Sequence, residues 1–321
     1  MEEQGTREAE QTTAVVVHYG PWETTRRTLD SLRRNAAGLQ VRVVDNGGEA
    51  IPGDVERLDG ISVKVLSASR NIGYGAACNL GVRHAASDWL LFLNNDVELL
   101  EGTLGNMAAD LRENRDFGAV GPRFLDAEGR PMRSIGRDPS PRRVLFENLF
   151  LPRLLPGIPF FHGHHTARIS HRTPRSVETL MGAVLLVRRA AFEGVGGFCE
   201  DYFFYAEESD LLYRMRRVGW RIWFEPEARA IHHGGVASTM IDEKERDRRL
   251  HAGFKLYARR FHGEKGERRV TRALRFGAAL RYWLSFLERG PRRSARRRRY
   301  ANIQAMYRRG EITASTHTPL G

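Results

Sequence analysis

The stretch Trp89-Leu-Leu-Phe-Leu-Asn-Asn-Asp96 decides the fold of this chain. Its apolar residues run without interruption and then stop at two amides and a carboxylate, a pattern typical of a buried strand that ends in a loop. Because side chains two positions apart on an extended chain point the same way, Asn94 and Asp96 are expected on one side. Mg²⁺ takes one or two protein carboxylates together with substrate phosphates, and this strand end offers such oxygen ligands. An ordinary turn rich in Asn and Asp explains the same residues, so the segment alone leaves both interpretations open.

Short apolar runs alternate with amphipathic stretches around this segment, which predicts a doubly wound α/β sheet. In such sheets ligands bind beyond the carboxyl ends of the strands. The predicted strands are 14–18, 41–44, 61–66, 89–93, 178–187 and 221–224, and the predicted helices are 23–34, 75–86, 103–112 and 209–218.

The 321 residues suffice for one large domain with an appendage. We expect a loose polar tail over 1–12, an α/β domain over 13–240 and a basic helical region over 241–321. Within the α/β domain, 126–176 is rich in Pro, Gly and basic residues, and we interpret it as a long excursion that serves as a substrate lid.

The net charge of +12 favours polyanionic partners such as nucleic acid, anionic lipid or phosphorylated substrates. Two cysteines, Cys78 and Cys199, make a disulfide framework or a thiolate zinc site improbable and fit a reducing compartment. No run approaches the ~18 apolar residues that cross a bilayer, and the polar start lacks a signal-peptide pattern. The sequence therefore predicts a cytoplasmic protein.

Two further segments fit a nucleotide site at the same edge of the sheet. Asp45 ends the strand 41–44, where a carboxylate can accept hydrogen bonds from a base or a ribose, although a plain strand-to-turn junction is the alternative. The glycine-rich segment 70–79 resembles a dinucleotide fingerprint, but Cys78 replaces the third glycine and the segment follows the third strand. We therefore expect polar nucleotide contacts from Asn71 and Asn79 instead of a nicotinamide or flavin site.

Acidic and imidazole side chains supply the remaining candidates. Glu207 and Glu208 follow an aromatic run and open a predicted helix, where the helix dipole favours acids in any case. A carboxylate beside aromatic walls can also have its pKa raised and serve as a general base. His232 and His233 end another strand, and because neighbours on a strand point to opposite faces, only one would face the site.

Seven fragments in this order resemble the inverting family 2 glycosyltransferases of the GT-A fold, and among them the bacterial rhamnosyltransferase-like members. The resemblance covers Val15 to about Ser238 and implies a Rossmann-like, doubly wound mixed sheet with a C-terminal basic helical extension. The fragments are VVVHYG, VRVVDNGG, SRNIGYGAACNLG, WLLFLNNDVEL, GAVGPR, MGAVLLVRRAAFEGVGGFCEDYFFYAEESDLLYRM and GWRIWFEPEARAIHHGG.

The resemblance implies a role for each matching residue. The 94–96 segment is similar to the DxD-type motif, with Asp96 as a ligand of Mg²⁺ or Mn²⁺; Asn94 replaces the first acid, which puts metal ligation there in doubt. His232 matches a metal-binding histidine, and Glu207-Glu208 takes the place of a Glu-Asp pair, so either glutamate can be the base. The implied nucleotide-sugar contacts are Asp45, Asn71, Gly73, Asn94, Asn95 and Asp96, and the implied acceptor contacts are Gly197, Phe198, Tyr205 and Asp210.

The expected activity is therefore metal-dependent, inverting transfer from a nucleoside-diphosphate sugar, with dTDP-L-rhamnose as the best guess. The expected acceptor is a hydroxyl of a glycan or of a polyprenyl-diphosphate-linked sugar in cell-envelope polysaccharide synthesis. The alternative within this class is a UDP-hexose donor with a soluble acceptor, and the C-terminal tail would then serve homo-oligomerisation.

The basic C-terminal region leaves three interpretations. Residues 292–299 are almost purely basic and follow Tyr282, Trp283 and Phe286, a composition that suits contact with an anionic membrane surface at the inner face of the plasma membrane. A solvated charged face is the plain alternative. A nucleic-acid-binding protein is a different class, and the lack of a nucleic-acid-binding motif and the gathering of acidic residues argue against it.

Overall fold

The computed structural model describes residues 8–9, 11–164, 171–234, 241–287, 289–290 and 293–314. The chain forms two units: residues 1–136, 167–200 and 208–237 make the first, and 137–166, 201–207 and 238–321 make the second. Most of the predicted tail, 1–7 and 10, lies outside the described residues. Its end is packed, because Glu8 is buried and accepts a hydrogen bond of 2.7 Å from Arg112.

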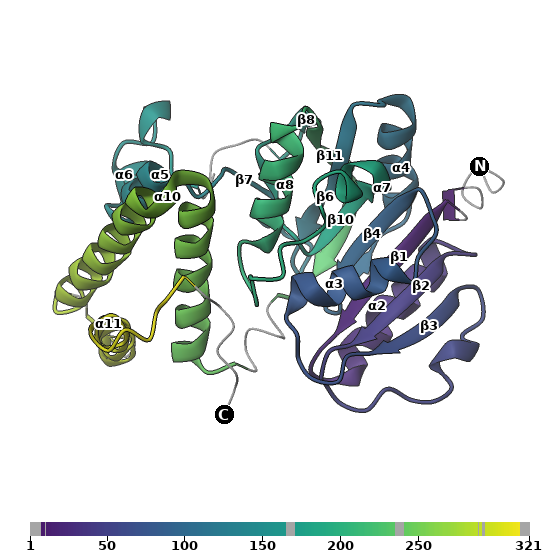
Figure 1. Cartoon of the computed structure of the whole chain (residues 1–321), viewed down its shortest axis with the longest axis horizontal. Coiled ribbons are helices and arrows are strands. Elements are labelled where there is room, and N and C mark those ends of the chain that lie inside the picture. Colours follow the sequence, from purple (N-terminus) through teal and green to yellow (C-terminus); the bar gives the residue numbers. More distant parts are fainter. Residues whose placement is uncertain are drawn as a thin grey trace. The chain divides into compact units, whose positions relative to one another are not determined.

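A nine-stranded mixed sheet forms the core of the first unit (Figure 1), which confirms the predicted α/β class. The order along it is β3-β2-β1-β4-β10-β6-β11-β5, with β8 paired to β11. Four strands run parallel: β1 (Thr12–His18), β2 (Gln40–Asp45), β3 (Ser62–Ser67) and β4 (Trp89–Asn94). The others are β5 (Val97–Leu99), β6 (Phe117–Leu125), β8 (Arg175–Ser176), β10 (Val184–Arg188) and β11 (Arg221–His232), of which β10 is antiparallel to both neighbours.

Helices cover both faces of this sheet, because its central strands are apolar on both sides. Val16 of β1 shares a core cluster with Leu29 and Leu32. Val15, on the opposite face, lies so close to Gly81 that a methyl group there would collide with it. The α-helices α2 and α3 supply these contacts. The bounds of the helices that accompany the sheet are α2 (Trp22–Asn35), α3 (Tyr74–Arg83), α4 (Thr103–Glu113), α7 (Arg189–Glu193) and α8 (Glu207–Arg217).

The predicted strand 178–187 is wrong as a single element. Its first part, β9 (Thr179–Leu180), pairs with β7 (Ile135–Gly136) in a separate two-stranded sheet, and only β10 enters the main sheet. Between them the chain turns at Gly182, whose carbonyl accepts a hydrogen bond from Tyr74 Oη at 3.2 Å. The predicted strand 221–224 was too short, because β11 continues to His232. The predicted helix 209–218 starts too late, because α8 begins at Glu207, so both glutamates lie in its first turn.

The second unit is helical. It contains α5 (Pro141–Asn148), α6 (Leu151–Leu154), the 3-10 turn η2 (Pro159–Phe161), α10 (Glu243–Leu284) and α11 (Arg293–Arg308). Both α5 and α11 pack on α10 (Figure 1). The region predicted to be helical, 241–321, contains α10 and α11, and α10 deviates from helical geometry at Gly263 (φ 62°). The middle of the predicted excursion is thus a regular part of this unit, because Val144 of α5 packs with Ala258 and Val270.

Among the described helices, none is long and apolar enough to cross a membrane.

Candidate active site

Asp96 and His232 meet at one edge of the sheet in the first unit. Asp96 lies in the two-residue turn between β4 and β5, and His232 ends β11 opposite Val97. The distance from His232 Nε2 to Asp96 Oδ1 is 3.3 Å, and the side chains are 13% and 5% exposed. His232 Nδ1 is buried and has no hydrogen-bond partner in the described part of the chain. The structure therefore brings together the two residues that the resemblance assigns to the metal.

This pair fits a divalent cation as a partial ligand set. Carboxylate oxygen and imidazole nitrogen are ordinary ligands for Mn²⁺, and Mg²⁺ and related ions complete their coordination with water and substrate phosphates. Within residues 8–314, as far as they are described, no group of three or more His, Cys, Asp or Glu side chains is arranged to hold an ion. A cation held here would thus depend on further oxygen atoms from a ligand.

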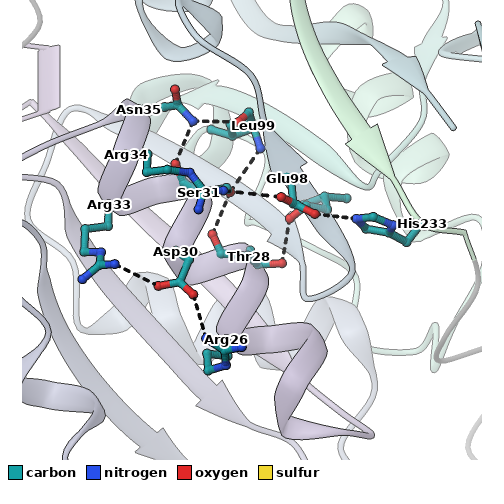
Figure 2. Close-up of polar contacts among 11 residues, drawn as sticks. Arg26, Thr28, Asp30, Ser31, Arg33, Arg34, Asn35, Glu98, Leu99 and His233 are labelled. Carbon is teal, nitrogen blue, oxygen red and sulfur yellow. Dashed lines mark hydrogen bonds and ion pairs between the residues drawn. The ribbon is translucent and has the colours of Figure 1, made fainter. Parts of the chain in front are cut away.

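The neighbouring histidine has a different partner, as expected for adjacent strand positions. His233 Nε2 lies 2.6 Å from Glu98 Oε1, and Glu98 also pairs with Arg34 of α2 at 3.5 Å. Figure 2 shows this polar network running from α2 to the ends of β5 and β11, with Thr28 Oγ1 donating to Val97 O at 2.7 Å. The network fixes the register of β5 against α2, and thereby the turn that carries Asp96.

The strand register aligns this edge with the predicted nucleotide residues. His18 at the end of β1 pairs with Asp45 of β2, and Val17 pairs with Asn94 of β4. Since neighbouring strands are about 4.8 Å apart, the backbones of Asp45 and Asn94 lie roughly 10 Å from each other. Carboxylate and amide groups therefore line a stretch of edge about as long as a nucleoside with its first phosphate.

Asn46 joins the two predicted nucleotide loops, a role that sequence reasoning missed. It is 3% exposed, its Nδ2 donates to Asn71 Oδ1 at 3.2 Å, and its Oδ1 accepts from Ile72 N at 2.8 Å. Asp45 beside it is half-buried and accepts from Gly47 N at 3.1 Å. The sequence draws attention to the carboxylate of Asp45, but the amide of Asn46 connects the two loops.

Gly73 completes this pair of loops. Its N–H donates to Asn71 Oδ1 at 3.0 Å, and its φ of 87° lies in the region that glycine favours. It directly precedes α3, so the loop ends at a helix N-terminus, where backbone N–H groups favour anions.

The loop after β2 also packs tightly against the turn after β1 at Gly48, a contact that was not predicted from the sequence. A methyl group there would lie 2.6 Å from His18 Nε2 and 2.7 Å from Gly20 N. His18 is fully buried, with Nδ1 at 2.6 Å from Thr25 Oγ1 and Nε2 at 2.8 Å from Glu49 O. A histidine inside an apolar strand carries no local signal for such contacts, because its partners come from other loops.

Asn94 and Asn95 have distinct surroundings. Asn94 N donates to Ala183 O at 2.9 Å, and its side chain is half-buried. Asn95 is 4% exposed, and its Nδ2 donates to Tyr19 O at 2.9 Å and Thr25 Oγ1 at 3.0 Å. Asn95 therefore holds the turn between β1 and α2 and keeps Asp96 in place from the other side.

Glu208 reaches the same edge of the sheet through Gly182. A methyl group on Gly182 would lie 3.1 Å from Glu208 Cβ, so the first helical turn of α8 rests on this glycine. Tyr74 Oη donates to the Gly182 carbonyl, and the next carbonyl, that of Ala183, accepts from Asn94 N. Glu208, one of the two glutamates predicted as the general base, therefore lies beside the end of β4.

Residues 205–207 belong to the second unit and carry unusual backbone. Tyr205 and Ala206 have φ of 76° and 72°, in the left-handed region that non-glycine residues rarely adopt. Such conformations cost about 1–3 kcal/mol each and are concentrated at functional sites. Burial raises the pKa of Tyr205, and Glu207, which follows, is 5% exposed.

The predicted acceptor residues of the first unit form a braced loop. Asp210 is fully buried and pairs with Arg214, whose Nη2 donates to Gly197 O at 2.8 Å. Asn79, predicted as a nucleotide contact, instead binds the Phe198 backbone in both directions, with distances of 2.9 and 3.0 Å. The Phe198 ring is 2% exposed. These contacts fix the shape of the loop and place the ring of Phe198 in the core.

Comparisons with known proteins identify the family of this chain. Residues 13–195 match the model described as glycosyl transferase family 2, and the chain belongs to this family. It is similar to rhamnosyltransferases: it is 31% identical over 233 residues to the N-acetylglucosaminyl-diphospho-decaprenol L-rhamnosyltransferase of Mycobacterium tuberculosis, covering 68% of this chain and 75% of that protein. Its identity to rhamnosyltransferase WbbL of Escherichia coli is 25% over 233 residues, covering 68% and 82%.

Solved structures confirm the GT-A fold. The mannosyltransferase PcManGT from Pyrobaculum calidifontis, in complex with GDP-Man and Mn²⁺, has a TM-score of 0.54 at 16% identity and covers 95% of this chain and 83% of its own. S. aureus TarS 1-349 in complex with UDP has a TM-score of 0.52 at 15% identity, covering 94% and 92%. At such identities the likeness concerns the fold alone.

Proposed function

We propose that this family 2 glycosyltransferase is metal-dependent and inverting, and that it takes its sugar from a nucleoside-diphosphate donor. The observation that supports this most is the Asp96–His232 contact of 3.3 Å at the carboxyl edge of the sheet, in register with Asp45 and Asn94. The same edge is where ligands bind in open α/β sheets.

In this proposal the loops after β2 and β3 bind the nucleoside. Asp45 accepts hydrogen bonds from the base or ribose, and Asn71 and Gly73 form the adjoining wall. Asn94 faces the donor, whereas the buried Asn95 contributes by positioning Asp96. Asp96 and His232 would hold the divalent ion, which when bound neutralises the charge that develops on the departing diphosphate.

A glutamate at the start of α8 would act as general base. Glu208 is our first choice because it stands beside Gly182 and the end of β4, and Glu207 is the alternative because it is buried behind strained backbone. The carboxylate takes the proton of the acceptor hydroxyl while that oxygen attacks the anomeric carbon on the face opposite the diphosphate. A single displacement of this kind inverts the configuration. The loop with Gly197 and Phe198, braced by Asp210, and Tyr205 would shape the acceptor side.

The donor and acceptor follow from the relatives. The two rhamnosyltransferases support dTDP-L-rhamnose as donor, and the decaprenol-linked acceptor named for the first supports a polyprenyl-diphosphate-linked sugar or glycan in cell-envelope polysaccharide synthesis. We place the enzyme in the cytoplasm at the inner face of the membrane, with 13–240 as the transferase domain and 241–321 as the basic region that touches anionic lipid. A UDP-hexose donor with a soluble acceptor is the second candidate.

Two measurements test this function. A thermal-shift screen of nucleoside diphosphates and their sugars with Mn²⁺ should single out one donor, because a ligand that binds only the native state raises its apparent stability. Turnover with that donor should then fall at least about a thousandfold in Asp96→Ala and Glu208→Gln, as expected when an essential electrostatic or proton-transfer group is lost.

Glu193→Gln is the matched control, since Glu193 is an exposed partner of Arg189 in α7. It should keep full activity. Full activity in Asp96→Ala would contradict the metal assignment, and full activity in Glu208→Gln together with loss in Glu207→Gln would move the base to Glu207.

A further inference from the structure

The second unit contains a cavity of about 420 Å³ that is rich in arginine. Its lining residues come from the end of α5, from α6, from the end of α10 and from α11. Among the lining residues are Arg153, Arg281, Arg296 and Arg299, together with the apolar side chains of Phe150 and Leu284. None of them belongs to the proposed transfer site.

The positive charge of this cavity is only partly compensated. Arg299 is neutralised by Asp247, with two hydrogen bonds of 2.8 and 2.6 Å. In the described residues no carboxylate lies within ion-pair distance of Arg153 or Arg281. Glu147 is the one acidic residue in the lining, so the cavity retains an excess of positive charge.

Arg281 is held in place by neutral groups. Its Nη1 donates to Asn148 Oδ1 at 3.0 Å and Gly277 O at 3.1 Å, and its guanidinium lies over the Phe150 ring, 4.4 Å from the centroid. Burial lowers the pKa of Arg281, although the guanidinium stays charged at neutral pH. The charge of Glu147 offsets this cost only in part, and an anion bound in the cavity would offset more of it.

Exposed apolar side chains occur on the helical segments that form the cavity. Leu284 lines it and is 37% exposed, while Leu154, Trp283 and Leu287, from the same helical segments, are 69%, 68% and 80% exposed. Exposed large apolar residues beside a polar pocket are typical of a surface that receives an apolar ligand or a membrane.

We propose that this cavity binds the phosphate or diphosphate group of an amphiphilic ligand, whose apolar chain contacts Leu154, Trp283 and Leu287. The forked guanidinium donors of arginine match phosphate oxygen atoms in number and geometry. The exposed apolar residues distinguish an amphiphile from a free phosphate ion. The cavity lies outside the proposed transfer site, and the choice of an isoprenyl diphosphate as its ligand rests on the lipid-linked acceptor of the proposed function.

Isothermal titration calorimetry of the full chain tests this site. The probes are geranyl diphosphate, inorganic pyrophosphate and geraniol, all in the presence of a chelator, so that metal-dependent binding at the Asp96–His232 edge does not contribute. The variant is Arg153→Gln with Arg296→Gln, both exposed residues whose replacement leaves the helix contacts of Arg281 intact. Arg298→Gln, an exposed residue of the same helix α11 that lies outside the lining, is the matched control.

Geranyl diphosphate should bind the wild-type chain at least about tenfold more tightly than pyrophosphate, and geraniol should bind more weakly than either. The double variant should lose about tenfold or more in affinity for geranyl diphosphate, because each charge-assisted hydrogen bond contributes roughly that factor, and Arg298→Gln should stay within about twofold. Equal affinities of the double variant and the control would overturn the site. If the wild-type chain bound pyrophosphate as tightly as geranyl diphosphate, the proposal of an amphiphilic ligand would be overturned, and the ligand would be a free phosphate.

Discussion

Replacing Gly48 by alanine should destabilise the first unit, because the loop after β2 is docked against the turn after β1 with no room for a side chain. An added methyl group would lie 2.6 Å from His18 Nε2 and 2.7 Å from both Gly20 N and Gly20 O. Carbon atoms normally approach such neighbours no closer than about 3.5 Å, so the overlap is close to 1 Å. Two of the three neighbours are backbone atoms, which cannot rotate away.

The loss in free energy of unfolding can be estimated from the steric overlap and from the hydrogen bonds that are weakened. Overpacking costs about 1–3 kcal/mol. Moving the loop also weakens the hydrogen bonds from Glu49 N to Gly20 O (2.9 Å) and between His18 Nε2 and Glu49 O (2.8 Å), at about 1 kcal/mol each. The free energy of unfolding should thus fall by about 3–5 kcal/mol, which lowers the melting temperature of a unit of this size by about 10 °C.

Thermal unfolding of the variant and of a matched glycine control measures this. Gly53→Ala is the control, because a methyl group there would meet nothing within 4 Å and its φ is ordinary. It should change the melting temperature by no more than about 2 °C. The Gly48 variant should also lose the stabilisation that a nucleoside diphosphate gives the wild type. Equal melting temperatures for the two variants would refute the docking of this loop.

Two other predictions concern the second unit. Burial lowers the pKa of His251 from 6.5 to about 4, so between these pH values the unfolded chain binds a proton that the native chain excludes. The free energy of unfolding should therefore fall by up to about 3 kcal/mol as the pH drops from 6.5 to 4. Urea titrations at several pH values should show a smaller fall for His251→Gln than for the wild type. At Ala206, whose φ is 72°, a β-branched residue is strongly disfavoured; Ala206→Val should lower the free energy of unfolding by about 2 kcal/mol and reduce turnover, whereas Ala206→Gly should be close to wild type in a denaturant titration.

The parallel strands could be predicted from the sequence because their signal is local. Runs such as 89–93 are apolar on both faces, and only a sheet covered by helices buries both. The division of 178–187 could not be predicted, because Gly182 leaves the ladder to receive the hydroxyl of Tyr74, more than a hundred residues away in sequence. The helical C-terminal region was predicted, but the helices α5 and α6 inside the 126–176 excursion were missed, since α5 packs on α10, which lies far along the chain.

In the site, too, residues with a local sequence signal could be predicted, whereas residues whose partners are distant in sequence could not. Asp96 stands out at the end of an apolar strand, and the alternation of side chains on β11 correctly separates His232 from His233. Asn46 and His18 were missed because their contacts come from other loops. Asn79, interpreted as a nucleotide contact, instead binds the backbone of Phe198, a partner 119 positions further along the chain.

Calorimetric titration of UDP and dTDP, with Mn²⁺ or with a chelator, tests most directly whether the β4–β11 edge holds a cation for a diphosphate. Wild type should bind the preferred nucleotide at least about tenfold more tightly with Mn²⁺, in the range of one or two good ligand contacts. Asp96→Asn and His232→Gln should lose this gain, whereas His233→Gln, which alters only the histidine that faces Glu98, should retain it. An undiminished gain in Asp96→Asn and His232→Gln would contradict the account.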